Sequence, residues 1–353
     1  MPISDVDLAT RLEPLQVIKR LEAAKIKAVP TGIDHGTITA VSDGHPYEVT
    51  TLRQDVSTDG RRATVAFTDD WKADAARRDF TVNALSADPR TGEIFDYFAG
   101  LEDIHRRRIR FIGDPLQRIA EDHLRILRFF RFHARFGSGE PDAAAVDACA
   151  CRANDLMALS RERIADEMLK LLAVSDPAPT VTIMLQHGIL RPVLPEITAA
   201  RLANLTALVV SERSANNSSD PLRRLAALLP RDPAITQDVG SRLRLSNKAR
   251  KRVGCAAGTE LFSSPQALAY RLGVECAVDR LLLAAKTAEA SAISAWKAPR
   301  LPISGGTLIA RGLAEGPIVA RTLRQIEDRW VEAGFPEGAA FDNIVSEALS
   351  RAA

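Results

Sequence analysis

The chain has 353 residues, of which 46% are hydrophobic and 26% charged, and this predicts a folded protein of about two to three domains with a sizeable core. Its formal net charge is only +2, and no apolar run approaches the length of a membrane span. The composition therefore excludes a membrane-spanning protein and a chain that is basic throughout.

Up to about residue 112 the sequence mixes helical and strand-like patterns. A helical pattern covers residues 14–24. Alternating and β-branched residues predict strands or strand ends at 27–31, 37–41, 47–52, 63–67, 93–97 and 109–112. The sequence Asp43-Gly44-His45-Pro46 predicts a hairpin connection between two of these strands. We therefore expect a small mixed sheet with helices in this part of the chain.

Two carboxylates stand one residue apart near the start, in Asp5-Val6-Asp7. Alternate residues of a strand point to the same face, so Asp5 and Asp7 would offer oxygen ligands side by side. Such a pair suits Mg²⁺, which would bridge triphosphate oxygens and activate a hydroxyl nucleophile. A solvated acidic turn would give the same pattern. Glu48 is a third candidate ligand, although a charge on a strand face explains it equally well.

Residues 77–84 read Arg-Arg-Asp-Phe-Thr-Val-Asn-Ala, with polar and apolar side chains interleaved. Arg78 offers donors for a phosphate group, and Asp79 and Asn83 offer hydrogen bonds to a ribose or to backbone. Asp79 would equally well cap a local helix.

A long helix is predicted after Gly113, with Asp114 as its N-cap and Pro115 in its first turn. On that helix a stripe at three-residue spacing would carry Asp122, Arg125, Arg128 and Arg131. The stripe fits a site in which Asp122 and Arg125 hold a base edge and the later arginines meet phosphates. A solvated helix face with intrahelical ion pairs is the alternative.

The rest of the chain has helical periodicity, with Ser160 as the N-cap of a helix over 161–172 and prolines separating the later helices. Residues 214–220, rich in Ser and Asn, predict a loop or linker. Charge is unevenly placed: residues 221–252 hold nine basic and two acidic side chains, whereas 313–353 hold four arginines and seven acids. The basic cluster either contacts nucleic-acid phosphates or forms a solvated surface, and the candidate contacts are Arg242, Arg244, Lys248, Arg250, Lys251 and Arg252.

The sequence contains four cysteines with neither metal-ligand spacing nor the density of a disulfide scaffold: Cys149, Cys151, Cys255 and Cys276. We interpret them as small buried apolar residues in a reducing environment. Because no signal-peptide pattern is present either, we expect a soluble cytoplasmic protein. The sequence does not indicate an oligomeric state.

Together these motifs resemble the class II tRNA nucleotidyltransferase and bacterial poly(A) polymerase family. Its metal motif, ribose and phosphate motif, hinge motif, nucleotide-selecting helix and neck motif are matched, in family order, by residues 5–10, 77–84, 96–103, 121–132 and 160–167. Beyond residue 172 the likeness is helical character and a Leu-Arg-Leu-Ser-Asn stretch at 243–247. The resemblance implies an α+β nucleotidyltransferase head over 1–112, a helical neck over 113–172, and an all-α body and tail over 173–353 that hold RNA.

The resemblance further implies that the protein adds CMP and AMP from CTP and ATP to the 3′ end of tRNA, with Mg²⁺, and releases pyrophosphate. Asp5 and Asp7 would bind the metal, and Arg78, Arg128 and Arg131 the triphosphate. Asp122 and Arg125 would select the base, because cytosine and adenine both place an amino donor beside a ring-nitrogen acceptor whereas uracil and guanine reverse that pattern.

Two other readings stay open. One is a poly(A) polymerase of the same fold, which would use only ATP; the acidic C-terminal part argues against it, because like charges repel arbitrary RNA. The other is an RNA-binding remnant without activity, since the family's Gly-Gly-x-Val-Arg-Asp loop, which holds the triphosphate and precedes the paired aspartates, is not in the sequence from Met1. A start codon assigned too far downstream would explain that difference, and we expect the missing segment upstream.

Overall fold

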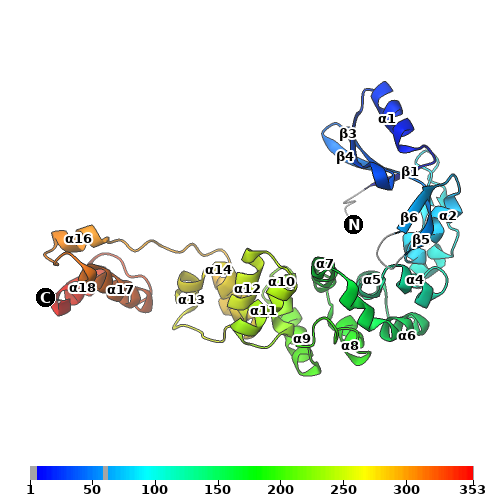
Figure 1. Cartoon of the computed structure of the whole chain (residues 1–353). Coiled ribbons are helices and arrows are strands. Elements are labelled where there is room, and N and C mark those ends of the chain that lie inside the picture. Colours follow the sequence, from blue (N-terminus) through cyan, green and yellow to red (C-terminus); the bar gives the residue numbers. More distant parts are fainter. Residues whose placement is uncertain (1–5, 59–62, 353) are drawn as a thin grey trace. The chain divides into compact units, whose positions relative to one another are not determined.

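The computed structural model describes residues 6–58 and 63–352 and divides into two compact units (Figure 1). Unit 1 consists of Met1–Leu171 and Ile183–Val193, and unit 2 of Leu172–Thr182 and Leu194–Ala353. Strands occur only in unit 1 among the described residues, whereas unit 2 is helical. The α+β fold class predicted from the sequence is confirmed.

The principal sheet of unit 1 has four strands in the order β1-β4-β3-β2. β1 pairs in parallel with β4, and the remaining neighbours are antiparallel. Asp43 and Gly44 form the two-residue turn between β3 and β4, both with positive φ, so the predicted hairpin is confirmed. α1 packs against β2, β3 and β4 (Figure 1). The bounds are β1 (Asp7–Thr10), α1 (Pro14–Ala23), β2 (Lys27–Gly32), β3 (Thr37–Ser42) and β4 (His45–Thr51).

Two further strand pairs follow, β5 (Arg53–Thr58) with β6 (Ala63–Phe67), and β7 (Ser86–Ala87) with β8 (Ile94–Phe95). The strand predicted at 93–97 is therefore reduced to two residues. The one predicted at 109–112 is a single antiparallel bridge between Phe80 and Phe111. The remaining short elements of this part are η1 (Ile33–His35), α2 (Trp71–Ala76), η2 (Thr81–Asn83) and α3 (Gly100–His105).

The helix predicted from Asp114 onward is interrupted. Asp114 caps α4 (Pro115–Glu121) as expected, with its side chain accepting from Gln117 N. Asp122 then leaves the helical region, with φ −151° and ψ 108°, and its carboxylate accepts from Leu124 N before α5 (Arg125–Phe136) begins. An aspartate side chain competes for backbone N–H groups in this way. One continuous helical stripe was therefore the wrong prediction, because Asp122 lies in the bend between two helices.

Aromatic packing attaches the 77–84 segment to α5. Phe80 and Phe129 are fully buried, and the ring of Phe80 lies 5.1 Å from Phe111, 6.2 Å from Phe129 and 5.0 Å from Phe132. Because Phe80 fills the core, its polar neighbour Asp79 is held at the edge of this cluster. The helical part of unit 1 continues through α6 (Ala143–Cys151), η3 (Ala153–Ala158) and α7 (Arg161–Leu172), which Ser160 caps as predicted.

Helices make up the remaining chain, and in five of them proline occupies the first turn. The loop predicted at 214–220 is confirmed over 215–220, whereas Ser214 is the last residue of α9. In the described part of the chain every helix is too short or too polar to cross a lipid bilayer. The bounds are α8 (Ala178–Gln186), α9 (Ala199–Ser214), α10 (Pro221–Leu228), α11 (Pro233–Arg242), α12 (Asn247–Ala257), α13 (Pro265–Leu272), α14 (Val274–Leu283), α15 (Thr287–Ile293), α16 (Gly305–Ala310), α17 (Pro317–Glu332) and α18 (Ala339–Ala352).

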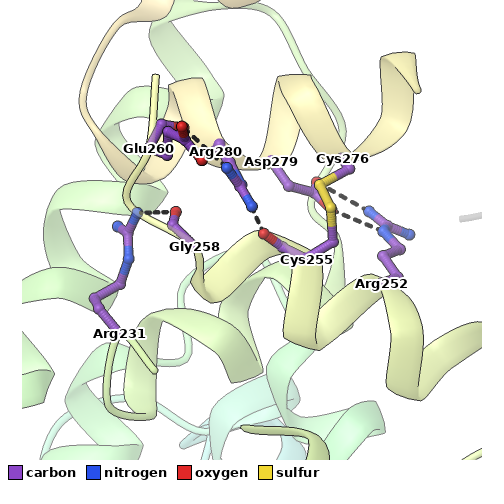
Figure 2. The surroundings of a disulfide bond; sticks show 8 residues. All are labelled: Arg231, Arg252, Cys255, Gly258, Glu260, Cys276, Asp279 and Arg280. Atoms are coloured by element: carbon purple, nitrogen blue, oxygen red, sulfur yellow. Dashed lines mark hydrogen bonds and ion pairs between the residues drawn. A yellow bond between two sulfur atoms is a disulfide. The ribbon is translucent and has the colours of Figure 1, made fainter. Parts of the chain in front are cut away.

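The expectation that all four cysteines are unpaired and buried is wrong. Cys255 of α12 and Cys276 of α14 form a disulfide, with 6.0 Å between their Cα atoms (Figure 2). The two residues are 21 positions apart, and only the packing of α12 against α14 brings them together. Cys149 is buried, and burial raises the pKa of its thiol, whereas Cys151 is exposed.

Candidate functional site

A pocket of about 220 Å³ lies at the bend between α4 and α5, opposite the 77–84 segment. Both sequence-predicted motifs contribute to it, although they are about 45 residues apart in the chain. Its lining is formed by Arg77, Arg78, Asp79, Asn83, Asp122, Arg125 and Arg128. Six of the seven predicted nucleotide-binding residues thus meet in one place, and Arg77 joins them.

Asp79 organises one side of this pocket. Its Oδ1 accepts from Asn83 Nδ2 and from Phe80 N, both at 3.0 Å, and its Oδ2 accepts from Arg128 Nε at 2.6 Å. Only 6% of the residue is exposed. Asp79 therefore orients Asn83 and Arg128, which present their remaining polar atoms to the pocket.

Arg125 is fixed by three acceptors on the opposite side. Nη1 donates to Arg118 O at 2.8 Å and to Glu121 Oε2 at 2.5 Å, and Nη2 donates to Arg77 O at 3.0 Å. Glu121 also accepts from Arg118. These contacts engage three of the five N–H groups of the guanidinium, so its position is set without using all its donors.

Asp122 is held from a distant helix. Arg163 of α7 donates from Nη2 to both carboxylate oxygens, at 2.9 Å and 3.2 Å. The Asp122 side chain is 30% exposed, so its acceptors remain accessible from the pocket. The sequence motif around 160–167 therefore contributes a residue that orients a predicted base selector.

Asp74 is a contributor that the sequence reasoning missed. It lies on α2 and is 6% exposed, and its carboxylate accepts from Arg53 N and Arg77 Nε, both at 3.1 Å. Its second oxygen lies 3.5 Å from Arg78 Nη2. Asp74 thus ties two pocket arginines to β5. No local pattern distinguishes it from an ordinary acidic helix residue, so burial was the only signal and required the structure.

Arg131 does not line the pocket. Its Nε donates to Glu167 Oε2 at 2.6 Å, and its guanidinium lies 4.8 Å from the centre of the Phe132 ring. Glu167 is 3% exposed. Arg131 lies almost one helical turn beyond Arg128 on α5, and there its side chain faces Glu167 of α7.

Of the two predicted metal ligands, Asp5 and Asp7, the structure describes only Asp7. Asp5 lies outside the described residues. Asp7 is exposed on β1 and stands in register with Glu48 on the parallel strand β4, so the two carboxylates belong to the same face of the sheet. The described residues contain no group of three or more His, Cys, Asp or Glu placed to hold an ion. Two neighbouring oxygen donors nonetheless have the chemistry that a hard divalent cation prefers.

The second basic cluster, in unit 2, is divided by its partners. Arg242 Nη2 lies 2.7 Å and 2.8 Å from the two oxygens of Glu196. Arg252 is only 12% exposed and contacts Asp279, Asp220 and Glu275 at 2.8, 2.9 and 3.0 Å. Carboxylates therefore compensate the charges of both Arg242 and Arg252, and contact of these two arginines with RNA stays a prediction. Lys248 and Lys251 are exposed, as is Arg244, whereas Arg250 is half-buried.

Comparison with known proteins adds independent support. Residues 1–110 match the family model described as "Poly A polymerase head domain", and residues 142–201 match "Probable RNA and SrmB-binding site of polymerase A". The chain is 33% identical over 351 residues to mitochondrial CCA tRNA nucleotidyltransferase 1 of Mus musculus, covering 94% of this chain and 79% of that protein. It is 30% identical to the CCA-adding enzyme of Streptococcus gordonii, covering 95% of this chain and 86% of that protein.

Solved structures agree on the fold. The structure of the Bacillus stearothermophilus CCA-adding enzyme in complex with CTP aligns with a TM-score of 0.77 at 26% identity, over 99% of this chain and 90% of that chain. The Thermotoga maritima CCA-adding enzyme complexed with tRNA aligns with a TM-score of 0.68 at 18% identity, over 99% of this chain and 87% of that chain, a likeness in fold alone.

Proposed function

We propose that this chain, which belongs to the family of CCA-adding tRNA nucleotidyltransferases, adds CMP and AMP from CTP and ATP to the 3′ end of tRNA and releases pyrophosphate. The observation that carries the proposal is the pocket in which Asp122 and Arg125 stand beside Arg78 and Arg128. Relatives at 30% identity or more are named for CCA addition, which favours this activity over poly(A) synthesis.

Base selection follows from the two anchored side chains. Asp122 supplies acceptors that suit the exocyclic amino group of cytosine or adenine, and Arg125 supplies donors that suit the adjoining ring nitrogen. Uracil and guanine would leave polar groups of the pocket without partners, and a site built around specific hydrogen bonds discriminates strongly against that. Because Arg163 and Glu121 hold the selectors, little conformational freedom remains to be lost on binding.

The triphosphate would lie against Arg78 and Arg128. The Arg78 side chain is 39% exposed and Arg128 is 28% exposed, so both can reach a ligand while Asp74 and Asp79 orient them. Guanidinium groups fit phosphate oxygens through paired N–H donors. Arg131, which contacts Glu167 outside the pocket, supports α5 in this proposal and does not touch the phosphates.

The metal expected for this chemistry is Mg²⁺, with Asp7 and Asp5 as the residues that would hold it. When bound, the ion lowers the pKa of the terminal ribose hydroxyl and stabilises charge on the phosphates. The chain's own part is to present the Asp7 carboxylate from β1, on the sheet face it shares with Glu48.

The proposal is tested by supplying labelled CTP and ATP to a tRNA that lacks its 3′ triplet. We expect incorporation of C followed by a single A. Long products of A without C would instead identify a poly(A) polymerase. A protein that binds tRNA but shows neither incorporation nor stabilisation against heat by CTP would be the inactive RNA-binding remnant.

The metal assignment has its own test. Replacing Asp7 with Ala should abolish transfer, and the fold should persist because the Asp7 side chain is exposed on an edge strand of the sheet. Circular dichroism checks the fold. Incorporation at the wild-type rate would disprove the assignment.

A further inference from the structure

A second pocket, of about 180 Å³, lies between α11 and α12 in unit 2. Every side chain that lines it carries a hydrogen-bond donor, and none is a carboxylate: Gln237, Ser241, Asn247, Arg250 and Lys251. No aromatic or aliphatic side chain contributes to the lining either. The pocket therefore suits a small anion, and its lining contains no aromatic ring on which a nucleobase could stack.

Close packing of α11 and α12 shapes this pocket. A Cβ atom added to Gly254 would lie 2.6 Å from Gln237 Cγ, and one added to Gly240 would lie 3.1 Å from Arg250 Cγ. The two glycines therefore allow the helices to approach until side chains of both line one hollow.

The charge of Arg250 is not compensated by an acid in its observed contacts. Its Nη1 donates to Ser241 Oγ at 2.8 Å, and its Nη2 donates to Asn247 Oδ1. Both acceptors are neutral, and accepting from Arg250 leaves the Ser241 hydroxyl hydrogen and the Asn247 amide hydrogens to donate elsewhere. Arg250 Nε is buried and has no hydrogen-bond partner within the described residues. The Arg250 guanidinium is thus held in place beside the exposed Lys251, and its observed partners do not neutralise its positive charge.

Neighbouring arginines contrast with Arg250. Arg252, two residues on, is surrounded by three carboxylates and faces α14, where Figure 2 shows it bonded to Asp279. Arg223 and Arg224 share Glu212 inside unit 2. Carboxylates inside unit 2 therefore compensate these three arginines, whereas at the α11–α12 pocket the charge of the cluster faces outward.

We propose that the α11–α12 pocket binds a backbone phosphate of the RNA substrate. This inference rests on the proposed function, because it takes tRNA as the polyanion. Lys248 lies exposed one turn before Lys251 on α12, so positive charge continues beyond the pocket. A chain of phosphates would use both the pocket and that continuation, whereas a free phosphate would use the pocket alone.

The test replaces both pocket cations, Arg250→Gln with Lys251→Gln, in the full chain. Its matched control is Lys297→Gln with Arg300→Gln, which removes two positive charges from an exposed part of unit 2 outside the pocket. The dissociation constant for tRNA lacking its 3′ triplet is measured over a series of salt concentrations. For the pocket variant we expect affinity to fall about tenfold or more and the salt slope to fall by about 1 to 2. The control should change neither by as much.

Binding of CTP and of inorganic phosphate, measured by calorimetry without RNA, separates the possible sources of the phosphate. Unchanged CTP affinity together with weakened tRNA binding supports the proposal, even if the base-selecting site later proves to be misassigned. Weaker binding of CTP or inorganic phosphate with unaltered tRNA binding would overturn it, as would equal losses in the pocket variant and the control.

Two gentler variants keep the test valid if the double variant does not fold. Lys251→Gln alters one exposed side chain, and Gln237→Glu introduces a carboxylate into the pocket without changing its size. Both should weaken tRNA binding at low salt. Wild-type affinity in both, with melting temperature preserved, would exclude the site.

Discussion

The orientation of Asp122 by Arg163 offers the sharpest test of the nucleotide pocket. Replacing Arg163 with Gln removes the Nη2 donor that lies 2.9 Å and 3.2 Å from the two carboxylate oxygens. A hydrogen bond to a charged group is worth about 1.5–3 kcal/mol when buried. Because these side chains are 37% and 30% exposed, solvent screening reduces the figure to about 1–2 kcal/mol. A rate effect of about 5- to 30-fold corresponds to that range.

The loss should appear in base selection, because Asp122 lies in the non-helical bend and has few other constraints. The measurement is kcat/KM for CTP, ATP, UTP and GTP with a tRNA that lacks its 3′ triplet. We expect the ratio of CTP to UTP to fall about 5- to 30-fold in the variant. Arg163→Lys, which keeps the charge but not the planar donor group, should recover only part of it.

Arg161→Gln is the matched control, since it removes the same charge from the same helix, where Arg161 contacts the sulfur of Met157 at 3.8 Å. Two results would refute the reasoning. One is a folded Arg163→Gln protein whose CTP to UTP ratio stays within about twofold of wild type, a difference below the expected range. The other is an equal loss of discrimination in the control, which would point to general electrostatics.

Three measurements of stability test other parts of the structure. Asp103 is fully buried and accepts hydrogen bonds from Thr81, Arg108 and Arg110; burial alone would raise the pKa of its carboxyl group, but these donors lower it. Asp103→Asn should therefore reduce the free energy of unfolding in urea by about 3 kcal/mol, and an unchanged midpoint would contradict this. Burial lowers the pKa of His133 in spite of Glu140, so the folded state binds fewer protons than the unfolded state; stability should be complete above about pH 6.5 and decline as pH falls below it, and His133→Gln should flatten that part of a pH series of urea unfolding. Reduction of the Cys255–Cys276 disulfide should cost unit 2 about 3 kcal/mol by releasing its loop, and an identical melting curve with and without a dithiol reductant would argue against the bond.

Local chemistry in the sequence was enough to predict several elements of the fold. Asp43-Gly44 can adopt positive φ at both positions, which predicts a tight hairpin, and Asp114-Pro115 combines a side-chain cap with a ring suited to the first helical turn. Each of these patterns acts within a few residues, and the structure confirms both. The grouping of Arg78, Asp79 and Asn83 with Asp122, Arg125 and Arg128 was also anticipated, through the family's motif order and not through any local pattern.

Packing between distant segments decided the rest. Asp122 lies outside both helices, where its carboxylate accepts from Leu124 N and from Arg163, 41 residues away. The Cys255–Cys276 bond required α12 to lie against α14, and the same packing buried Arg252 among three carboxylates while Arg250 kept neutral partners. A run of basic residues in the sequence indicates only how much positive charge that segment carries. Only the tertiary structure determines which of those charges are compensated, because a salt bridge depends on a distance of a few ångströms between atoms that the sequence leaves far apart.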